Sequence, residues 1–178
     1  MAEIKSAIEI ALERTKNMIP SAAEKEKLRE EEDSSKALAL VNRYLHVDLH
    51  FKDVEKELAR MNAAERERME KLMLRNLAEA IRLEGENELV FEGIETLRGG
   101  ARQTLSRIRA LKERYKEAGD EAYRKVEEDL KRSLEDRGIS GSAVEPKVSG
   151  SPEWQNALTQ FRPAFEEQLA GYREELQK

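Results

Sequence analysis

Cysteine is absent from this chain of 178 residues, and histidine occurs only twice. The absence of cysteine excludes disulfide bonds and thiol chemistry, and it fits a reducing compartment, so we expect a cytoplasmic protein. A glycine-rich phosphate loop, a dinucleotide-binding fingerprint and a nucleophile-elbow motif are also missing. The sequence therefore predicts neither an enzyme nor a cofactor.

Long apolar runs are missing as well. No uncharged stretch approaches the length of about 18 residues that a membrane span requires. Charged residues interrupt positions 1–20, where we expect no secretion signal because an apolar core is lacking. Acidic residues outnumber basic ones by 37 to 32, and the net charge of -5 repels nucleic acids and anionic lipids. We expect no membrane binding, and nucleic-acid binding only through a local basic patch.

Helix-forming residues dominate what is present. Ala, Glu, Lys, Leu and Arg account for 103 of the 178 residues, more than the roughly 50% that is typical of long helices and coiled coils. No segment alternates between apolar and polar residues with a period of two, so strands are not expected. The predicted fold class is all-α: an elongated helical bundle with a long coiled-coil-like helix and a C-terminal amphipathic helix.

Apolar spacing of three and four residues predicts several helices. The segment 21–45 has a charged half, 24–33, that we expect to be solvated or frayed, and an apolar half with Leu38, Val41, Tyr44 and Leu45. Asn62 and Glu65 form a capping-box pattern that predicts a helix start, and Gly85 is its expected terminator. The remaining predicted helices cover residues 4–19, 48–61, 89–97, 101–137 and 152–176, and Gly138 is the expected stop of the fourth.

Three parts follow from this organisation. Residues 1–138 are expected to form a helical bundle with a long helical arm, and residues 139–151, rich in glycine and serine, a flexible linker. Residues 152–178 are expected to form an amphipathic helix that packs on the bundle or on a partner. Pro163 falls inside that helix, but the apolar pattern keeps its phase across it, which predicts one kinked helix rather than two.

An aromatic stripe in the last helix is the first candidate site. Its residues are spaced by three or four: Trp154, Leu158, Phe161, Phe165, Leu169 and Tyr172. Four exposed aromatic rings would form a patch of roughly 600 Å², at or above the largest patch of a typical soluble monomer. The stripe must therefore be covered, either by its own chain or by a protein partner, which includes a second copy of the chain.

A basic segment, residues 98–116, is the second candidate site. It carries seven basic residues and a single acidic one. At 100° per residue, Arg102, Arg109 and Lys116 lie on one shoulder of the apolar stripe, and Arg107 and Arg114 lie on the other. This arrangement favours pairing with an acidic helix, such as residues 84–95, while RNA or ribosome contact is the alternative.

Two histidines four residues apart, His46 and His50, are the third candidate site. On one helix face this spacing can hold Zn²⁺. Asp48 could instead cap a second helix, which would separate the imidazoles, and neither histidine belongs to the Glu-x-x-His motif of di-iron bundles. We favour two ordinary histidines at a helix junction and assign no metal.

These observations lead to one functional hypothesis and its alternatives. The sequence predicts a non-catalytic helical scaffold or adaptor that acts through helix–helix contacts with a protein partner or by self-association as a homo-oligomer. The alternative is an RNA- or ribosome-associated factor that uses residues 98–116. A metal-dependent bundle protein that uses His46 and His50 comes third.

Overall fold

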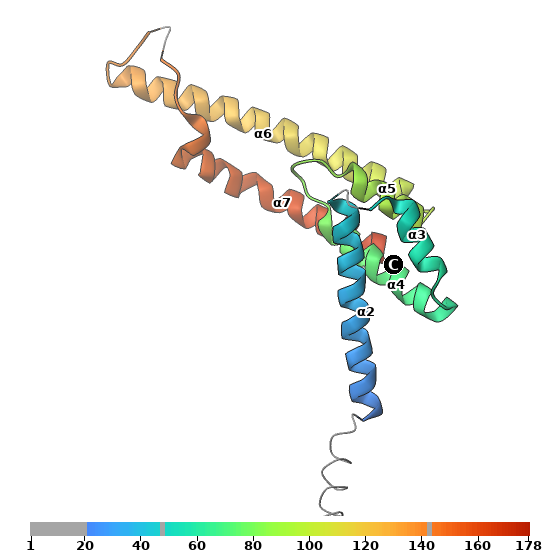
Figure 1. The fold of residues 1–178 in the computed structure, drawn as a ribbon. Helices are drawn as coiled ribbons and strands as arrows, with labels where there is room; N and C mark the ends of the chain where they lie inside the picture. Colours follow the sequence, from blue (N-terminus) through green and yellow to red (C-terminus); the bar gives the residue numbers. More distant parts are fainter. Residues whose placement is uncertain (1–20, 47–48, 142–143) are drawn as a thin grey trace, which may run out of the picture. The chain divides into compact units, whose positions relative to one another are not determined.

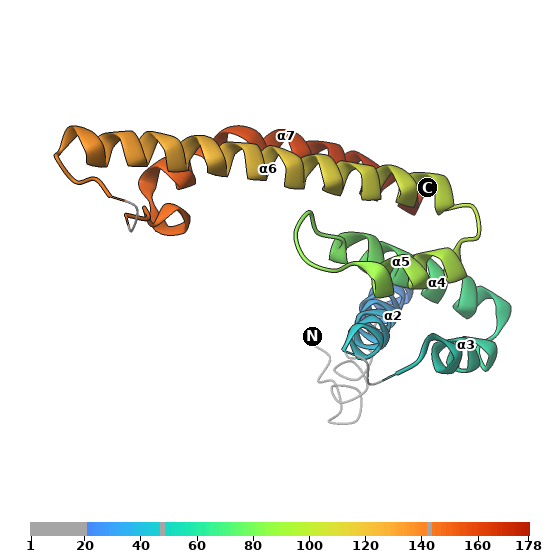
Figure 2. The same ribbon diagram turned by 90° about the horizontal axis from the view of Figure 1, so that it is seen from above.

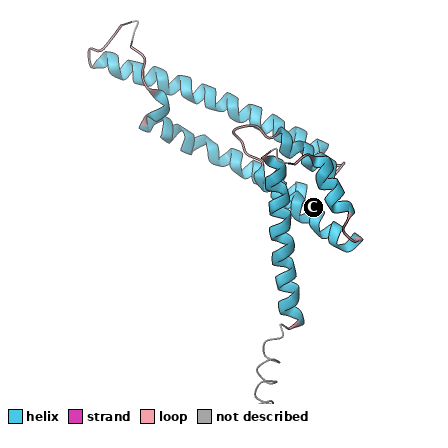
Figure 3. Cartoon of the chain, viewed as in Figure 1, coloured by secondary structure: helices cyan, strands magenta, loops and turns pink. Residues whose placement is uncertain are grey.

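The computed structural model describes residues 21–46, 49–141 and 144–178, and the regular structure in these ranges is entirely helical (Figure 3). Six α-helices and one short 3-10 helix occur there, without a strand. The predicted all-α fold class is thus confirmed. The helix expected at 4–19 falls outside the described residues, and none of the described helices is long and apolar enough to cross a bilayer.

The chain divides into two compact units, residues 1–73 and 74–178. The first unit contains helix α2 (Ala22–Leu45), helix α3 (Phe51–Ala59) and the beginning of helix α4 (Ala63–Ala80). The second contains the end of α4, helix α5 (Glu88–Leu97), helix α6 (Arg102–Asp136), the 3-10 helix η1 (Val148–Gly150) and helix α7 (Pro152–Gln177). The division lies inside α4 and does not coincide with a break in the apolar pattern of that helix.

Helix α2 is regular from its first residue. The Ser21 side chain accepts a hydrogen bond from the Glu24 amide at 3.2 Å, and the Ser21 amide donates to the Glu24 carboxylate at 2.7 Å, which completes a capping box. The charged half, expected to be solvated or frayed, is thus helical and largely exposed. Val41 and Tyr44 are buried as expected, whereas Leu38 is 49% exposed, because the buried face includes Leu40 in its place.

A hydrophobic contact joins the end of α2 to the start of α3. Tyr44 packs edge-to-face on Phe51, with ring centroids 5.3 Å apart. Phe51, Val54 and Leu58 of α3 are buried, as their spacing predicts. The first unit therefore has a small apolar core between the end of α2 and the face of α3.

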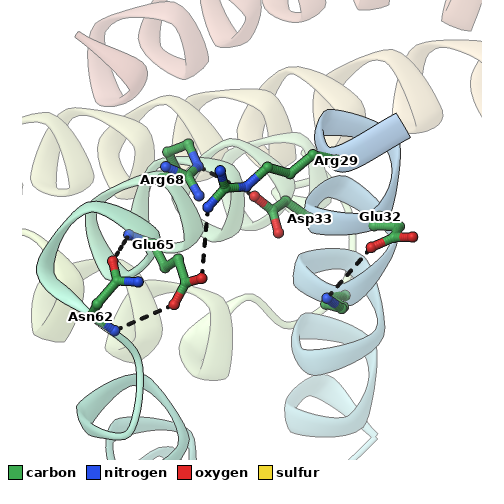
Figure 4. A network of polar contacts seen from close by, with 7 residues as sticks. Arg29, Glu32, Asp33, Asn62, Glu65 and Arg68 are labelled. Atoms are coloured by element: carbon green, nitrogen blue, oxygen red, sulfur yellow. Dashed lines mark hydrogen bonds and ion pairs between the residues drawn. The ribbon is translucent and has the colours of Figure 1, made fainter. Parts of the chain in front are cut away.

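Polar contacts tie α2 to the start of α4 (Figure 4). Arg29 lies 3.6 Å from Glu65, and Arg68 hydrogen-bonds Asp33 at 3.3 Å. Glu65 also belongs to the predicted capping box, because its amide donates to the Asn62 side chain at 3.0 Å and its carboxylate accepts from the Asn62 amide at 3.4 Å. The capping box thus starts α4 and holds the acceptor of an interhelical ion pair.

The end of α4 differs from the prediction. Gly85 has the expected left-handed backbone, with φ of 78°, but the helix already ends at Ala80. The buried Asn87 side chain accepts from the Arg82 amide at 3.0 Å and donates to the Arg82 carbonyl at 2.8 Å. These bonds satisfy the backbone outside the helix, so the chain leaves it one turn early.

Helices α6 and α7 lie side by side in antiparallel directions (Figures 1 and 2). Gly138, with φ of 76°, ends α6 as predicted, since its amide donates to the Glu135 carbonyl and the Ile139 amide donates to that of Leu134. Ser151 caps α7 by accepting from the Trp154 amide at 3.1 Å. Helix α7 continues without a break through Pro163, so the prediction of one helix rather than two is confirmed.

Replacing Asn62 by alanine should lower the free energy of unfolding by about 1 kcal/mol, because the first turn of α4 loses its side-chain acceptor. Urea denaturation followed by circular dichroism measures this change. Asn42→Ala is the matched control, since Asn42 is exposed within α2 and alanine favours a helix interior. An Asn62→Ala protein as stable as the wild type would contradict the role of the cap.

Candidate functional site

The aromatic stripe of α7 packs on α6 of the same chain. Phe161 and Phe165 flank Tyr115, with ring centroids 5.6 and 5.4 Å from it. Further along the pair, Trp154 packs edge-to-face on Tyr123 at 5.4 Å. The cover that the sequence requires is therefore supplied, in this single chain, by α6.

This cover is incomplete. Among the stripe residues Leu169 is fully buried, whereas the other five keep intermediate exposure: Trp154, Leu158, Phe161, Phe165 and Tyr172. Tyr123 on the facing helix remains 39% exposed. One edge of the aromatic contact between the two helices therefore meets solvent.

The first shoulder of the basic segment faces α5, as the sequence predicts. Arg109 lies 3.3 Å from Glu88 and 4.0 Å from Glu95, and its guanidinium stands 4.7 Å from the centre of the Phe91 ring. Arg102, 3.9 Å from Glu95, has a side chain that is 83% exposed. Lys112 donates to the Gly85 carbonyl at 2.6 Å, and its partial burial lowers its pKa.

The second shoulder faces α7. Glu175 accepts from Arg107 and, at 3.0 Å, from the Thr104 hydroxyl. These hydrogen bonds, that of Thr104 first, and the charge of Arg107 lower the pKa of Glu175. The Arg107 guanidinium also stands 5.2 Å from the centre of the Tyr172 ring. The basic residues of α6 thus bind two neighbouring helices, one on each side.

Two residues of the predicted shoulders remain, Arg114 and Lys116. Arg114 donates to the Gln168 side chain at 3.3 Å. Lys116 is exposed and has no hydrogen bond or ion pair within the described part of the chain. Lys116 is thus available to another molecule, as is Arg102, whose side chain is 83% exposed.

Two further arginines hold the ends of helices: Arg98, the first residue of the basic segment, and Arg173 of α7. Arg98 donates to the Leu176 carbonyl at 2.7 Å and to the Glu175 carbonyl at 3.3 Å, which satisfies the C-terminal end of α7. Arg173 donates to the Ile81 carbonyl just beyond α4. Sequence analysis missed both roles, since the acceptors are backbone atoms that lie far away along the chain.

A glutamate outside the predicted site closes the other end of the aromatic cluster. The Tyr115 hydroxyl donates to Glu84 at 2.6 Å, and Arg162 lies 3.6 Å from the same carboxylate. Burial and this hydrogen bond raise the pKa of Tyr115 to about 12. The phenol therefore stays protonated at physiological pH and acts as a hydrogen-bond donor, not as a base.

A hollow of about 240 Å³ opens between α6 and α7. Its lining combines aromatic, aliphatic and charged residues: Glu84, Tyr115, Lys116, Gly119, Asp120, Tyr123, Trp154, Leu158 and Phe161. Gly119 stands midway between the two tyrosines of α6, which are four residues away on either side. Its missing side chain leaves room for the hollow, which we call the Gly119 hollow.

The histidines do not share a helix. His46 ends α2 and His50 precedes the first residue of α3. A helix junction, the interpretation that the sequence favours, therefore separates them. In the described ranges no group of three or more His, Cys, Asp or Glu side chains is placed to hold a metal ion.

Comparisons with protein-family models, with curated proteins and with solved structures found no match to this chain.

The ion pair of Glu175 predicts a pH-dependent contribution to stability. The folded pKa lies below the ordinary value of 4.5, so the carboxylate stabilises the fold above that value and loses this effect as the pH falls through the folded pKa. Glu175→Gln should lower the urea midpoint at neutral pH, and its difference from wild type should shrink as the pH falls through the folded pKa of Glu175. Glu174→Gln, an exposed neighbour, is the control; equal midpoints for the two variants at neutral pH would refute the contribution.

Gly119 offers a second test. A Cβ atom there would lie 3.9 Å from Phe161 Cζ, an ordinary contact, and glycine inside a helix costs about 1 kcal/mol relative to alanine. Gly119→Ala should therefore raise the melting temperature by about 2–4 °C. Gly171→Ala, in open space on α7, is the matched control and should show a similar rise. A Gly119→Ala protein that melts below wild type would mean that packing requires this glycine.

Proposed function

We propose that this chain is a non-catalytic helical adaptor that binds a protein partner through the exposed edge of the α6–α7 contact. The main support for this proposal is that the aromatic stripe keeps intermediate exposure although α7 packs on α6. Partly exposed aromatic rings provide large contact areas at a low entropic cost, and such residues dominate the affinity of protein interfaces. The described residues thus retain an aromatic edge suited to a partner.

The charged residues of this region support a role in packing. Interhelical ion pairs engage the charges of Arg107, Arg109 and Glu175. Burial and the hydrogen bond to Glu84 keep the Tyr115 phenol protonated. None of these groups is free to act as an acid, a base or a nucleophile. The geometry therefore favours binding over catalysis, and we include a cytoplasmic location in this proposal because the chain lacks cysteine.

RNA or ribosome association through residues 98–116 remains the alternative proposal. Arg102 and Lys116, which are largely exposed, favour it. However, Arg107, Arg109 and Lys112 already bind acidic side chains or a carbonyl of the same chain, so few cations are left for phosphates. Because affinity for RNA depends on the number of phosphates that are neutralised, this alternative has less support.

Affinity purification from cells that make the protein tests the adaptor proposal. A Tyr123→Ser/Leu158→Ser double variant removes apolar surface from the exposed edge and should reduce recovery of the bound protein on the order of tenfold. Leu28→Ser is the control, because Leu28 is 50% exposed on α2 and lies in the other unit. Circular dichroism checks that all three proteins are equally helical.

Light scattering over a range of concentrations covers self-association, since the partner can be a second copy of the chain. A mass that rises with concentration in the wild type, but not in the double variant, would identify a homo-oligomer. A monomer at every concentration, together with equal recovery of bound proteins by the double variant and the wild type, would refute the proposal.

A further inference from the structure

We propose that the Gly119 hollow binds an alkylammonium group. The source of that group would be a lysine side chain of the protein partner or a small free amine. In the first case the inference rests on the proposed function and identifies what the partner inserts beside the aromatic edge. Rings, carboxylates and an unfilled volume meet in this hollow, and each supports the assignment separately.

Aromatic rings make up much of the lining. Four of the nine aromatic residues of the chain contribute to it: Tyr115, Tyr123, Trp154 and Phe161. The planes of Tyr123 and Trp154 are inclined by 76°, and those of Tyr115 and Phe161 by 46°. Rings inclined in this way do not stack flat on one another. Aromatic rings that line a hollow attract ammonium groups, because the face of an aromatic ring is electronegative.

The charges of the lining favour a cation over an anion. Glu84 and Asp120 contribute two carboxylates, whereas Lys116 contributes one ammonium group. Glu84 is shared with Tyr115 and Arg162, and Arg162 is in turn balanced by Glu166 at 3.5 Å. Asp120 is exposed and makes no ion pair within the described ranges. The hollow thus has a carboxylate free to face an incoming cation, and Lys116 is the one basic residue of its lining.

The volume itself is not explained by packing. A methyl group at position 119 would meet its nearest neighbour at an ordinary distance, so the α6–α7 contact tolerates alanine there. Helix α6 nevertheless has glycine, the less favourable residue, at the position where a side chain would reduce the hollow. A binding role accounts for this choice, since the space is then used by a ligand.

Trp154 provides the measurement, because it is the one tryptophan of the chain and lines the hollow. Its fluorescence is titrated in the full-length protein with Nα-acetyl-lysine methylamide and with the norleucine analogue, which has the same shape without the charge. We expect a saturable change in which the lysine compound binds about threefold to tenfold more tightly. n-Butylamine, which is protonated at neutral pH, serves as the probe for a small free amine, and the tighter of the two cations identifies the source.

Variants assign the binding to the hollow. Asp120→Asn should weaken binding of the cation several-fold and leave that of the norleucine analogue unchanged, whereas Asp136→Asn, the same charge change at the end of α6, should alter neither. Lys116→Met should strengthen cation binding, because it removes the opposing charge. Gly119→Ala should weaken it while the protein remains folded, and Gly171→Ala should not.

Two results would overturn the proposal: equal binding of the lysine and norleucine compounds, or no saturable change with any cation. The titration requires no protein partner. Its failure would therefore leave the adaptor proposal intact, and failure of the purification and scattering experiments would leave the hollow free to bind a small amine.

Discussion

The contact between α6 and α7 is the interaction on which the second unit depends. Helix α7 carries an apolar stripe with four aromatic rings, and Tyr115 of α6 stands between two of them, Phe161 and Phe165. Without α6 this stripe would face water along its whole length, at a cost that a chain with so few large apolar residues cannot recover elsewhere. The long helix is therefore needed as a surface for α7, and its length sets how much of the stripe is covered.

The ion pairs around that contact determine which helices lie beside α6 more than they add to the stability of the fold. Exposed ion pairs contribute little individually, but the arginines on the two shoulders of α6 find acidic partners on different helices, Glu88 on α5 and Glu175 on α7. A reversed charge at either place would put like charges together and disfavour that pairing. Arg98 adds a further constraint. It donates to the carbonyls at the end of α7 and so fixes where that helix stops along α6.

Sequence analysis predicted what local rules determine. The Asn62 capping box and the Gly138 terminator depend on residues within one turn, and each occurs as expected. The failures depend on tertiary contacts. Leu38 is exposed because the packing of α3 selects a slightly different face of α2, and α4 ends early because Asn87 binds the backbone of Arg82. For the site, the pairing of the basic segment with residues 84–95 was predictable from charge and helical spacing. The hollow was not predictable, because part of its lining comes from the facing helix.

The Gly119 hollow shows why a pattern in one helix cannot reveal a binding site. In the sequence, Gly119 is a single weak position in a long helix, and Tyr115 and Tyr123 are two apolar positions eight residues apart. Only when Trp154 and Phe161 lie opposite does the missing side chain become a lined space with a free carboxylate at its edge. A glycine within a helix–helix contact can thus create a binding site, because the absent side chain leaves the aromatic rings on both sides of it exposed. The same glycine destabilises the helix. The α6–α7 contact must therefore be stabilised elsewhere, at the buried residues Leu169 and Leu176.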